Sequence, residues 1–423
     1  CSSDLGSLKN KIWIRFVKDI LLINVFGADR PGVTSAVTSV LSTYNTTVLD
    51  IGQAVIHEQL NLGILTAVPN DFDTDELIAE VQTCVSNLSM KVKFLPISEQ
   101  LYQQWVEQQG KSRHIVTLLA RKIEAEHLDA LTKVISSYKL NIDKIVRLSG
   151  RIDLHKAEQL GNACIELSVR GEASEPKLFK KTLLELAHQY DIDIAFQEDT
   201  IFRRNRRLVV FDMDSTLIDA EVIDELAIEA GVGEEVAAIT EAAMQGKLDF
   251  KQSFEQRLAL LKGLDASVLH SVAQRLRLNE GAEHLISTLK KLGYKTAIVS
   301  GGFSFFGEYL QEILGVDYVY ANQLDIQDGQ VTGCVKGEII DGQRKALLLR
   351  ELADREGLML EQVIAVGDGA NDLPMLDIAG LGIAFRAKPL VKASAKQAIS
   401  SLGLDSILYL LGYSDKDTQT LDH

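Results

Sequence analysis

Two aspartates stand one residue apart after the apolar run LVVF, as Asp212 and Asp214 in DMDST, and Glu221 follows shortly after them. Carboxylates held this close repel one another unless a cation or a proton lies between them. A chain that keeps them together has a use for both, such as nucleophilic attack by one and proton transfer by the other. These residues are the starting point for a catalytic site.

Two later apolar runs also end in polar residues. TAIV leads into the segment 300–302, Ser-Gly-Gly, and VIAV leads into GDGAND, which contains Asp368, Asn371 and Asp372. Short apolar runs separated by helices predict a parallel sheet that is covered on both faces. Ligands of such sheets bind at the carboxyl ends of the strands, so we expect these polar residues to converge there.

Four aspartates at one sheet edge require a bound cation, and hard oxygen ligands favour Mg²⁺ over zinc. The neighbouring glycines allow backbone N–H groups to approach an anion closely. Lys345, at an expected helix start in GQRKALLL, supplies a positive charge for phosphate oxygens. Each feature alone has a common alternative, because D-x-D is often a solvated turn, S-G-G a plain loop and a single lysine a surface charge. Their joint order after three strands predicts phosphoryl transfer.

The segments DMDST, VSGG, Lys345 and GDGAND stand in the order of the four motifs of the haloacid dehalogenase superfamily, which residues 207–413 resemble. More narrowly, DMDSTLIDAE, AMQGKLDFKQSFEQRLALLKG and VGDGANDLPML resemble the phosphoserine phosphatase family. The resemblance implies an α/β fold, a doubly wound and mainly parallel sheet with a helical cap inserted near residues 222–292. It also implies hydrolysis of O-phospho-L-serine to L-serine and phosphate, the last step of serine biosynthesis.

The same resemblance implies roles for individual residues. Asp212 is expected to attack phosphorus and form an aspartyl-phosphate, while Asp214 protonates the serine oxygen and later takes a proton from water. If the strand geometry continues past residue 211, both side chains lie on one side. Mg²⁺ is expected on the Asp212 carboxylate, the Asp214 carbonyl and Asp368, with Asp372 in support. The phosphoryl oxygens are expected to contact the Ser300 hydroxyl, the Gly301 amide and Lys345.

Substrate selection is expected in the cap, because phosphoserine carries an ammonium and a carboxylate beside its phosphate. The resemblance places Glu221 at the ammonium and Arg257, as a fork, at the carboxylate. Met244 and Phe250 are expected to form an apolar wall, and Asn371 is a further substrate contact. Without the flanking match, Arg257 would be interpreted as a surface charge on a helix.

The first half of the chain contains one pattern twice. Expected strands at 20–26, 48–57, 60–68 and 90–96 with helices at 32–44 and 74–89 form one βαββαβ order, which recurs between 114 and 197. Two ferredoxin-like domains, 18–98 and 112–200, are therefore predicted, with a polar connector at 99–113. Both resemble ACT domains.

The turn FGADRPGV of the first of these domains resembles the amino-acid site of the ACT family, in which Asp29 and Gly32 would contact an effector. L-serine, the product of the implied reaction, is the expected effector, and an ACT-mediated homodimer is the expected assembly. The second domain has neither proline nor glycine at the corresponding turn, LLARKIEAEH, so it is expected only to pack or to dimerise.

The formal net charge of −15 argues against a general nucleic-acid or anionic-membrane surface. The basic run RRNRR at 203–207 is interpreted as a solvated hinge in an acidic protein. Four widely spaced cysteines suggest neither a zinc site nor a disulfide framework, and no apolar run has the roughly 18 residues of a membrane helix. We expect no signal peptide and a cytoplasmic protein.

Three other functions are compatible with parts of this pattern. P-type ATPases share GDGAND and an aspartyl-phosphate, but they have threonine where Asp214 stands and many membrane helices. A phosphatase for another small phosphomonoester would differ only in the cap. A serine-sensing protein with an inactive phosphatase domain would not need to retain Asp212, Asp214, Lys345 and Asp368 together.

Overall fold

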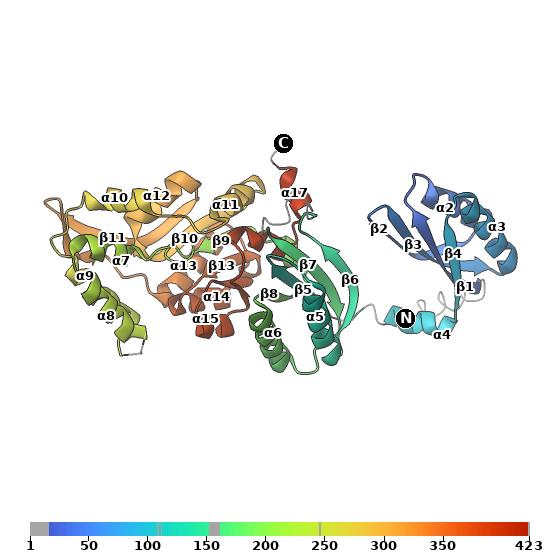
Figure 1. The fold of residues 1–423 in the computed structure, drawn as a ribbon, viewed down its shortest axis with the longest axis horizontal. Coiled ribbons are helices and arrows are strands. Elements are labelled where there is room, and N and C mark those ends of the chain that lie inside the picture. Colours follow the sequence, from blue (N-terminus) through green and yellow to red (C-terminus); the bar gives the residue numbers. More distant parts are fainter. Residues whose placement is uncertain (1–16, 108–109, 111, 152–160, 245–246, 422–423) are drawn as a thin grey trace, which may run out of the picture. The chain divides into compact units, whose positions relative to one another are not determined.

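The structure, a computed structural model, describes residues 17–107, 110, 112–151, 161–244 and 247–421 (Figure 1). Internal contacts divide the chain into two compact units, residues 1–110 and 111–423. Their boundary falls within the polar connector expected at 99–113. In the described ranges, no helix is both long and apolar enough to cross a membrane.

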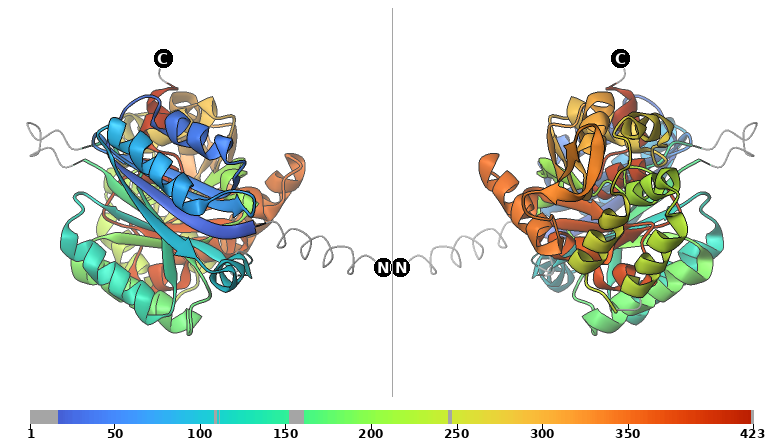
Figure 2. Two further views of the ribbon diagram at one scale, coloured as in Figure 1. Left: turned by 90° about the vertical axis from the view of Figure 1, so that its right-hand side faces the viewer. Right: turned by 90° about the vertical axis from the view of Figure 1, so that its left-hand side faces the viewer.

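The first unit contains a four-stranded antiparallel sheet of order β2-β3-β1-β4. Its elements are β1 (Val17–Ala28), α2 (Val33–Thr43), β2 (Thr47–Ile56), β3 (Gln59–Pro69), α3 (Thr74–Asn87), β4 (Lys91–Ile97) and the following α4 (Glu99–Glu107). Figure 2 shows α2 and α3 side by side over one face of the sheet. Alternate residues Leu21, Ile23 and Val25 of β1 pack under these helices, as a strand with one covered face requires. The predicted βαββαβ order is confirmed.

The second unit begins with the same order. Its elements are β5 (Arg113–Ala120), α5 (Ala125–Ser137), β6 (Asn141–Arg147), β7 (Ala163–Arg170), α6 (Pro176–Tyr190) and β8 (Asp193–Glu198), in a sheet of order β6-β7-β5-β8. Leu118 and Ile194 face the helices, whereas their neighbours Leu119 and Ala195 point the other way. That second face packs into the core of the C-terminal domain, which begins at residue 207.

Side chains fasten this second domain to the C-terminal domain. The Phe196 N–H donates to Gln397 Oε1 at 2.9 Å, and Gln397 Nε2 donates back to the Phe196 carbonyl at 2.6 Å. The N–H groups of Ser400 and Ser401 donate to the Asp193 carboxylate at 2.9 and 2.8 Å. Of the two alternatives expected for this domain, packing or dimerisation, the structure shows packing against the C-terminal domain.

The interpretation of RRNRR as a solvated hinge is wrong. Arg203, in the 3-10 helix η3 (Ile201–Arg204), is 1% exposed and forms an ion pair with Glu166. Arg206 is also buried, which lowers its pKa to about 10, and it donates to the carbonyl of Arg203 and to Gln197. The sequence alone could not show that the run lies between two packed domains, where long arginine stems fill space.

The C-terminal domain is built on a seven-stranded sheet of order β12-β11-β10-β9-β13-β14-β15. Its strands are β9 (Leu208–Phe211), β10 (Lys295–Phe303), β11 (Tyr318–Gln327), β12 (Gln330–Lys336), β13 (Val363–Gly367), β14 (Leu381–Phe385) and β15 (Gln397–Ile399). All neighbouring pairs are parallel except β11 with β12. The predicted mainly parallel α/β fold is confirmed.

Helices cover both faces of this sheet. Val209 and Phe211 share a core with α11 (Ala282–Lys291) and α12 (Ser304–Leu314), whereas Leu208 and Val210 share one with α13 (Gly342–Arg355) and α14 (Leu373–Ile378). Shorter elements complete the domain: η4 (Leu360–Gln362), η5 (Ala370–Asp372), α15 (Pro389–Ser394), η6 (Leu404–Ser406), α16 (Ile407–Leu410) and α17 (Asp415–Gln419). Burial on both faces explains why the strands are continuous apolar runs.

The insertion between β9 and β10 is helical, and α8 and α9 project beyond the sheet (Figure 1). It contains α7 (Val222–Ala230), α8 (Gly233–Met244), α9 (Phe250–Leu260) and α10 (Val268–Arg275). The β11–β12 hairpin joins this cap, since the N–H of Gly263 donates to the carbonyl of Val331 at 2.8 Å and the Val331 N–H donates to Leu264 at 2.9 Å. The hairpin was absent from the sequence prediction. Within the expected cap range, α11 lies beside the sheet instead.

Candidate active site

Asp212 occupies the position directly after β9. Its N–H donates to the carbonyl of Val366 at 2.8 Å, which continues the pairing of β9 with β13, and its Oδ1 accepts the Met213 N–H at 2.8 Å. Asp212 is 5% exposed. The strand pairing therefore fixes the aspartate at the carboxyl edge of the sheet, where the sequence placed it.

Asp214 is held by a turn, so the strand geometry does not continue to this residue, and the condition under which both aspartates would share one side of the strand is not met. The chain leaves the strand after residue 211, and Ser215 has a φ of 56°, in the left-handed region. Asp214 Oδ1 accepts the N–H of Val222, the first residue of α7, at 3.0 Å. The start of the cap thus orients this carboxylate.

Lys345 links two of the aspartates. It lies in the first turn of α13, and its Nζ is 2.8 Å from Oδ1 of Asp212 and 2.6 Å from Oδ1 of Asp372. The lysine side chain is fully buried. Burial alone would lower its pKa, but the two carboxylates raise it, so the ammonium stays charged.

Asp212, Asp368 and Asp372 offer carboxylate oxygens that all lie within 4.8 Å of one another. Burial, followed by the charges of the other two aspartates, raises the pKa of Asp368 to about 8. Burial and the charge of Asp212 likewise raise the pKa of Asp372 to about 7. Three carboxylates facing one ammonium leave an excess of negative charge. A hard divalent cation would neutralise it.

Asp372 has both oxygens occupied, because Lys345 holds Oδ1 and the Gly369 N–H donates to Oδ2 at 2.9 Å. A side chain at residue 367 would overlap its carboxylate, which explains the glycine there. Asn371 lies in η5 with its amide beside Gly369. The arrangement is consistent with a supporting position for Asp372.

The C-terminal end of β10 brings small groups close to the carboxylates. Ser300 is fully buried, and its Oγ accepts the Gly302 N–H at 2.8 Å. The Gly301 carbonyl accepts from the Asn322 side chain at 2.8 Å. A methyl group at residue 302 would overlap Oδ2 of Asp214. Glycine is required at residue 302 because the backbone of β10 lies so close to Asp214 there.

Glu221, the residue before α7, accepts a hydrogen bond from Ser215 Oγ at 2.8 Å. Part of the Glu221 side chain remains exposed. Partial desolvation by the surrounding protein nevertheless raises the pKa of its carboxyl, and the negative charge of Asp212 raises it further. Burial, followed by the charges of Glu221 and Asp212, raises the pKa of Asp214 well above its usual value. The raised pKa favours the protonated form of Asp214, which is the form a general acid requires.

The cap brings Phe250 to the site. Its ring would touch a side chain placed at residue 301, and it continues as a line of aromatic contacts to Phe254 and then Phe303. Arg257, one turn further along α9 from Phe254, is half-buried, and its positive charge acts on both Glu221 and Asp224. Met244 ends α8, but its side chain is outside the described part of the structure.

Two polar residues near the site were missed by the sequence analysis. Thr216 Oγ1 donates to Oδ1 of Asp368 at 3.4 Å, and Asn279 contacts the loop after Asp214 from a segment more than 60 residues away. Thr216 stands within DMDST and could have been found there. Asn279, in the connection between α10 and α11, carries no sequence signal of its own.

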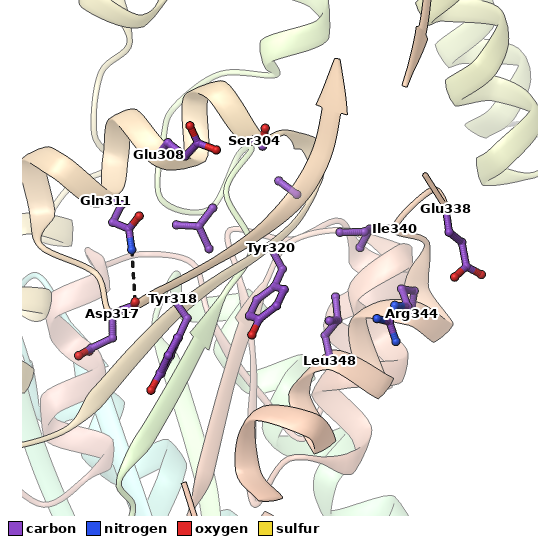
Figure 3. A pocket seen from close by; sticks show the side chains of 12 residues that line it. Ser304, Glu308, Gln311, Asp317, Tyr318, Tyr320, Glu338, Ile340, Arg344 and Leu348 are labelled. Atoms are coloured by element: carbon purple, nitrogen blue, oxygen red, sulfur yellow. Dashed lines mark hydrogen bonds between the residues drawn. The ribbon is translucent and has the colours of Figure 1, made fainter. Parts of the chain in front are cut away.

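A cavity of about 710 Å³ lies beside β11, lined by residues from α12, β11 and α13 (Figure 3). Gln311 borders it, and its amide donates to the carbonyl of Asp317. None of the four aspartates lines this cavity. The candidate site is therefore defined by the contacts among the carboxylates, the lysine and the Ser-Gly-Gly end of β10.

A second cavity, of about 380 Å³, lies in the first unit at the turn between β1 and α2. Asp29 and Gly32 line it together with Thr34 and Gln53, whose side chains form a hydrogen bond of 2.9 Å. Gly32 has a φ of 92° and precedes α2, and the first residues of that helix, Val33 to Ser35, also line the cavity. The N–H groups of a first helical turn have no partner within the helix and are available to an anion. The two expected effector residues thus share one cavity.

Three domain families match the chain. Haloacid dehalogenase-like hydrolases match residues 209–377, and ACT domains match residues 19–95 and 112–197. The first range covers the parallel sheet as far as β13 and ends before β14, and the other two correspond to the two βαββαβ sheets.

Similarity to individual proteins extends over nearly the whole chain. A phosphoserine phosphatase of Streptomyces coelicolor is 41% identical over 403 residues, covering 95% of this chain and 94% of its own. The phosphoserine phosphatase SerB2 of Mycobacterium tuberculosis is 38% identical over 408 residues, covering 95% of each. The crystal structure of a probable phosphoserine phosphatase from Vibrio cholerae, 32% identical, superposes with a TM-score of 0.57 over 74% of this chain and 90% of that one.

Proposed function

The chain belongs to the phosphoserine phosphatase family of haloacid dehalogenase-like hydrolases, and we propose that it hydrolyses O-phospho-L-serine to L-serine and phosphate through an aspartyl-phosphate. The observation that carries the proposal is the buried ammonium of Lys345 between Asp212 and Asp372. This contact holds the nucleophile and places a positive charge where phosphate oxygens would arrive. Such a reaction would complete serine synthesis.

The donor set fits Mg²⁺. Asp212 and Asp368 supply carboxylate oxygens within 4.8 Å, and the Asp214 carbonyl follows two residues after Asp212. Burial, together with the charges of neighbouring aspartates, raises the pKa values of Asp368 and Asp372, and a single Lys345 ammonium lies among the three carboxylates. A bound Mg²⁺ would neutralise the site and polarise the phosphoryl group.

In the first step the Asp212 carboxylate attacks phosphorus, and the bond between phosphorus and the serine oxygen breaks. Asp214 gives its proton to that oxygen, so L-serine leaves as an alcohol. In the second step Asp214 takes a proton from water, the water oxygen attacks phosphorus, and the bond to Asp212 breaks. Ser300, the Gly301 amide and Lys345 hold the phosphoryl oxygens through both displacements.

Selection of phosphoserine is assigned to the cap. Arg257 would bind the substrate carboxylate, Glu221 its ammonium, and Phe250 with Met244 would enclose the short carbon chain. The support is that α9 brings Phe250 against Gly301 at the end of β10, while the positive charge of Arg257 acts on Glu221. Asn371, beside Gly369, is the remaining substrate contact in this assignment.

We assign the cavity at Asp29 and Gly32 to L-serine as an effector. The support is its size, its position at a helix start that favours a carboxylate, and the side chains of Thr34 and Gln53. Serine bound there alters activity only if it prefers one of two states of the enzyme.

A homodimer through the first domain is part of the proposal. On the sheet face opposite α2 and α3, Phe26 is 40% exposed and Leu95 is 46% exposed. The equivalent face of the second domain is covered by the C-terminal domain, so the exposed face of the first is suited to a second copy of the chain. Sedimentation of the full chain at several concentrations measures this directly.

The experiment that tests the function is a phosphate-release panel over O-phospho-L-serine, O-phospho-L-threonine and sugar phosphates, each with and without Mg²⁺. We expect Mg²⁺-dependent release with phosphoserine strongly preferred. Preference for another phosphomonoester would reassign the substrate, and no release from any of them would support an inactive phosphatase domain.

A further inference from the structure

A single side chain shapes the loop that follows Asp214. The amide nitrogen of Asn279 donates to the carbonyls of Ser215, Thr216 and Ile218 at 3.3, 2.9 and 3.1 Å. Asn279 is 5% exposed, so these carbonyls are satisfied by the amide in a place with little access for water. An amide has two hydrogens, so two of the three contacts share one. The loop conformation therefore depends on where this amide points.

The loop needs such support. Ser215 adopts a left-handed φ of 56° without being glycine, a conformation that persists only when the surroundings hold it. The loop also carries groups of the site, because Asp214 precedes Ser215 and the Thr216 hydroxyl contacts Asp368. A shift of the loop would move the proton donor relative to Asp212.

Asn279 is in turn oriented by a charged network. Its Oδ1 accepts a hydrogen bond from Arg386 Nη1 at 3.3 Å, which directs the amide nitrogen toward the loop. Arg386 Nη2 donates to Oε2 of Glu280 at 2.8 Å. Arg386 directly follows β14, so this network connects the far half of the sheet with the loop after β9.

The network ends in the second βαββαβ domain. Arg121 forms a two-pronged ion pair with Glu280, with Nη1 2.6 Å from Oε1 and Nη2 2.5 Å from Oε2, while its Nε donates to the carbonyl of Ser401 at 3.1 Å. The fork geometry fixes the carboxylate in orientation as well as in position. Arg121 stands in the turn between β5 and α5.

We propose that Arg121 is a positioning residue of the phosphatase site, which acts through Glu280, Arg386 and Asn279 on the loop carrying Asp214. The proposal rests on the proposed function for its kinetic consequence only. The second βαββαβ domain thereby contributes to the chemistry of the site through this network.

The expected consequence of removing Arg121 is a lower kcat with little change in KM. Glu280 and Arg386 lose their fixed orientation, Asn279 then holds the loop less tightly, and Asp214 spends less time in position. We expect Arg121→Ala to lower kcat about three- to tenfold. KM should change less than about twofold, because the substrate groups bound by the cap are untouched.

The direct readout is hydrogen–deuterium exchange of the peptide covering residues 213–222 in the full chain. Its amides at Ser215, Ile218 and Asp219 donate to backbone carbonyls, so their exchange reports loop opening. Exchange should accelerate in Arg121→Ala. The matched control is Lys122→Ala, which removes a neighbouring surface ion pair with Glu124 that does not reach the C-terminal domain. Exchange and kcat in this control should equal those of the wild type.

A double mutant distinguishes an effect transmitted through Glu280 from a local effect of removing Arg121. Arg121→Ala combined with Glu280→Gln should have the same loop exchange and kcat as the more impaired single mutant. Unchanged exchange of residues 213–222 in Arg121→Ala would overturn the proposal, whatever happens to kcat. Because exchange needs no substrate, this result is independent of the proposed function. If phosphoserine is not hydrolysed, kcat is measured with an aryl phosphate instead.

Discussion

Gly302 faces Asp214 so closely that the methyl group of an alanine at residue 302 would overlap Oδ2 of the aspartate. The same methyl group would lie 2.8 Å from Cε of Met213 and 3.2 Å from Oγ of Ser300. The end of β10 and the segment after β9 therefore meet with no room for an added carbon atom. This close contact, and not the size of any cavity, fixes the position of Asp214 relative to the Ser-Gly-Gly end of β10.

Gly302→Ala should lower kcat on phosphoserine by about ten- to a hundredfold, because displacing Asp214 by 1 Å is enough to spoil its alignment. The fold should remain, since residue 302 does not have a left-handed φ. Steady-state kinetics and circular dichroism measure both effects. Gly52→Ala, where an added methyl group meets nothing within 4 Å, is the control. Wild-type kcat in Gly302→Ala would contradict the close placement.

Arg257→Ala should reduce kcat/KM for phosphoserine by about 30-fold or more, the effect of leaving a bound carboxylate unpaired at about 2–5 kcal/mol. Hydrolysis of an aryl phosphate, which has no carboxylate, should change less than about threefold. Arg275→Ala is the matched cap control, because Arg275 forms ion pairs with Glu225 and Glu229 on the cap surface. Equal losses on both substrates in Arg257→Ala would make this arginine structural.

The raised pKa of Asp214 predicts a pH dependence that differs between substrates. Burial raises this pKa, with Glu221 and Asp212 adding to it, so Asp214 holds its proton below the raised value and loses it as pH rises through that value. Phosphoserine needs the proton for its leaving oxygen, whereas p-nitrophenyl phosphate does not. In single-turnover measurements, the rate ratio of phosphoserine to p-nitrophenyl phosphate should fall with increasing pH. The effect of metal binding on the rate is common to both substrates and cancels in their ratio. A rate ratio that does not change with pH would therefore contradict the role of Asp214 as proton donor.

L-serine should inhibit the full chain, and Asp29→Ala should raise the half-inhibiting concentration about tenfold. Asp50→Ala, an exposed aspartate of β2 outside the cavity, should behave as the wild type. Titrations of phosphate release give both values. If Asp29→Ala is inhibited with the wild-type profile, serine acts as a product at the active site and the cavity in the first unit has no part in it.

Residues that act through their chemical identity were predictable from the sequence. Asp212, Lys345 and Asp368 stand in motifs whose order after strands implies convergence, and the structure places them within contact or near-contact distance. The strands themselves were predictable because apolar runs buried on both faces leave an unmistakable pattern. The two βαββαβ sheets followed from alternation in the same way.

Features that depend on tertiary packing were not predictable. Burial of Arg203 and Arg206 arises between two domains, and a basic run looks the same whether it is solvated or enclosed. The turn at Asp214 depends on Asn279, which is distant in sequence and has no motif. The sequence of the β11–β12 hairpin shows only the ordinary alternation of a strand pair, and this pattern does not indicate that the hairpin contacts the cap. Short-range patterns specify elements, whereas these contacts specify how the elements are placed.

The central claim is that Asp212 becomes phosphorylated by phosphoserine. Full-length protein is mixed with O-phospho-L-serine and Mg²⁺, quenched in acid within milliseconds, and analysed by mass spectrometry of the peptide that contains residues 208–222. We predict a phosphoryl group on Asp212 that disappears when substrate is exhausted. Asp212→Asn should carry none and should release phosphate about 10³-fold more slowly or worse, and chelation of Mg²⁺ should prevent labelling of the wild type. Rapid phosphate release from phosphoserine by Asp212→Asn, or a phosphoryl group on another residue, would contradict the account.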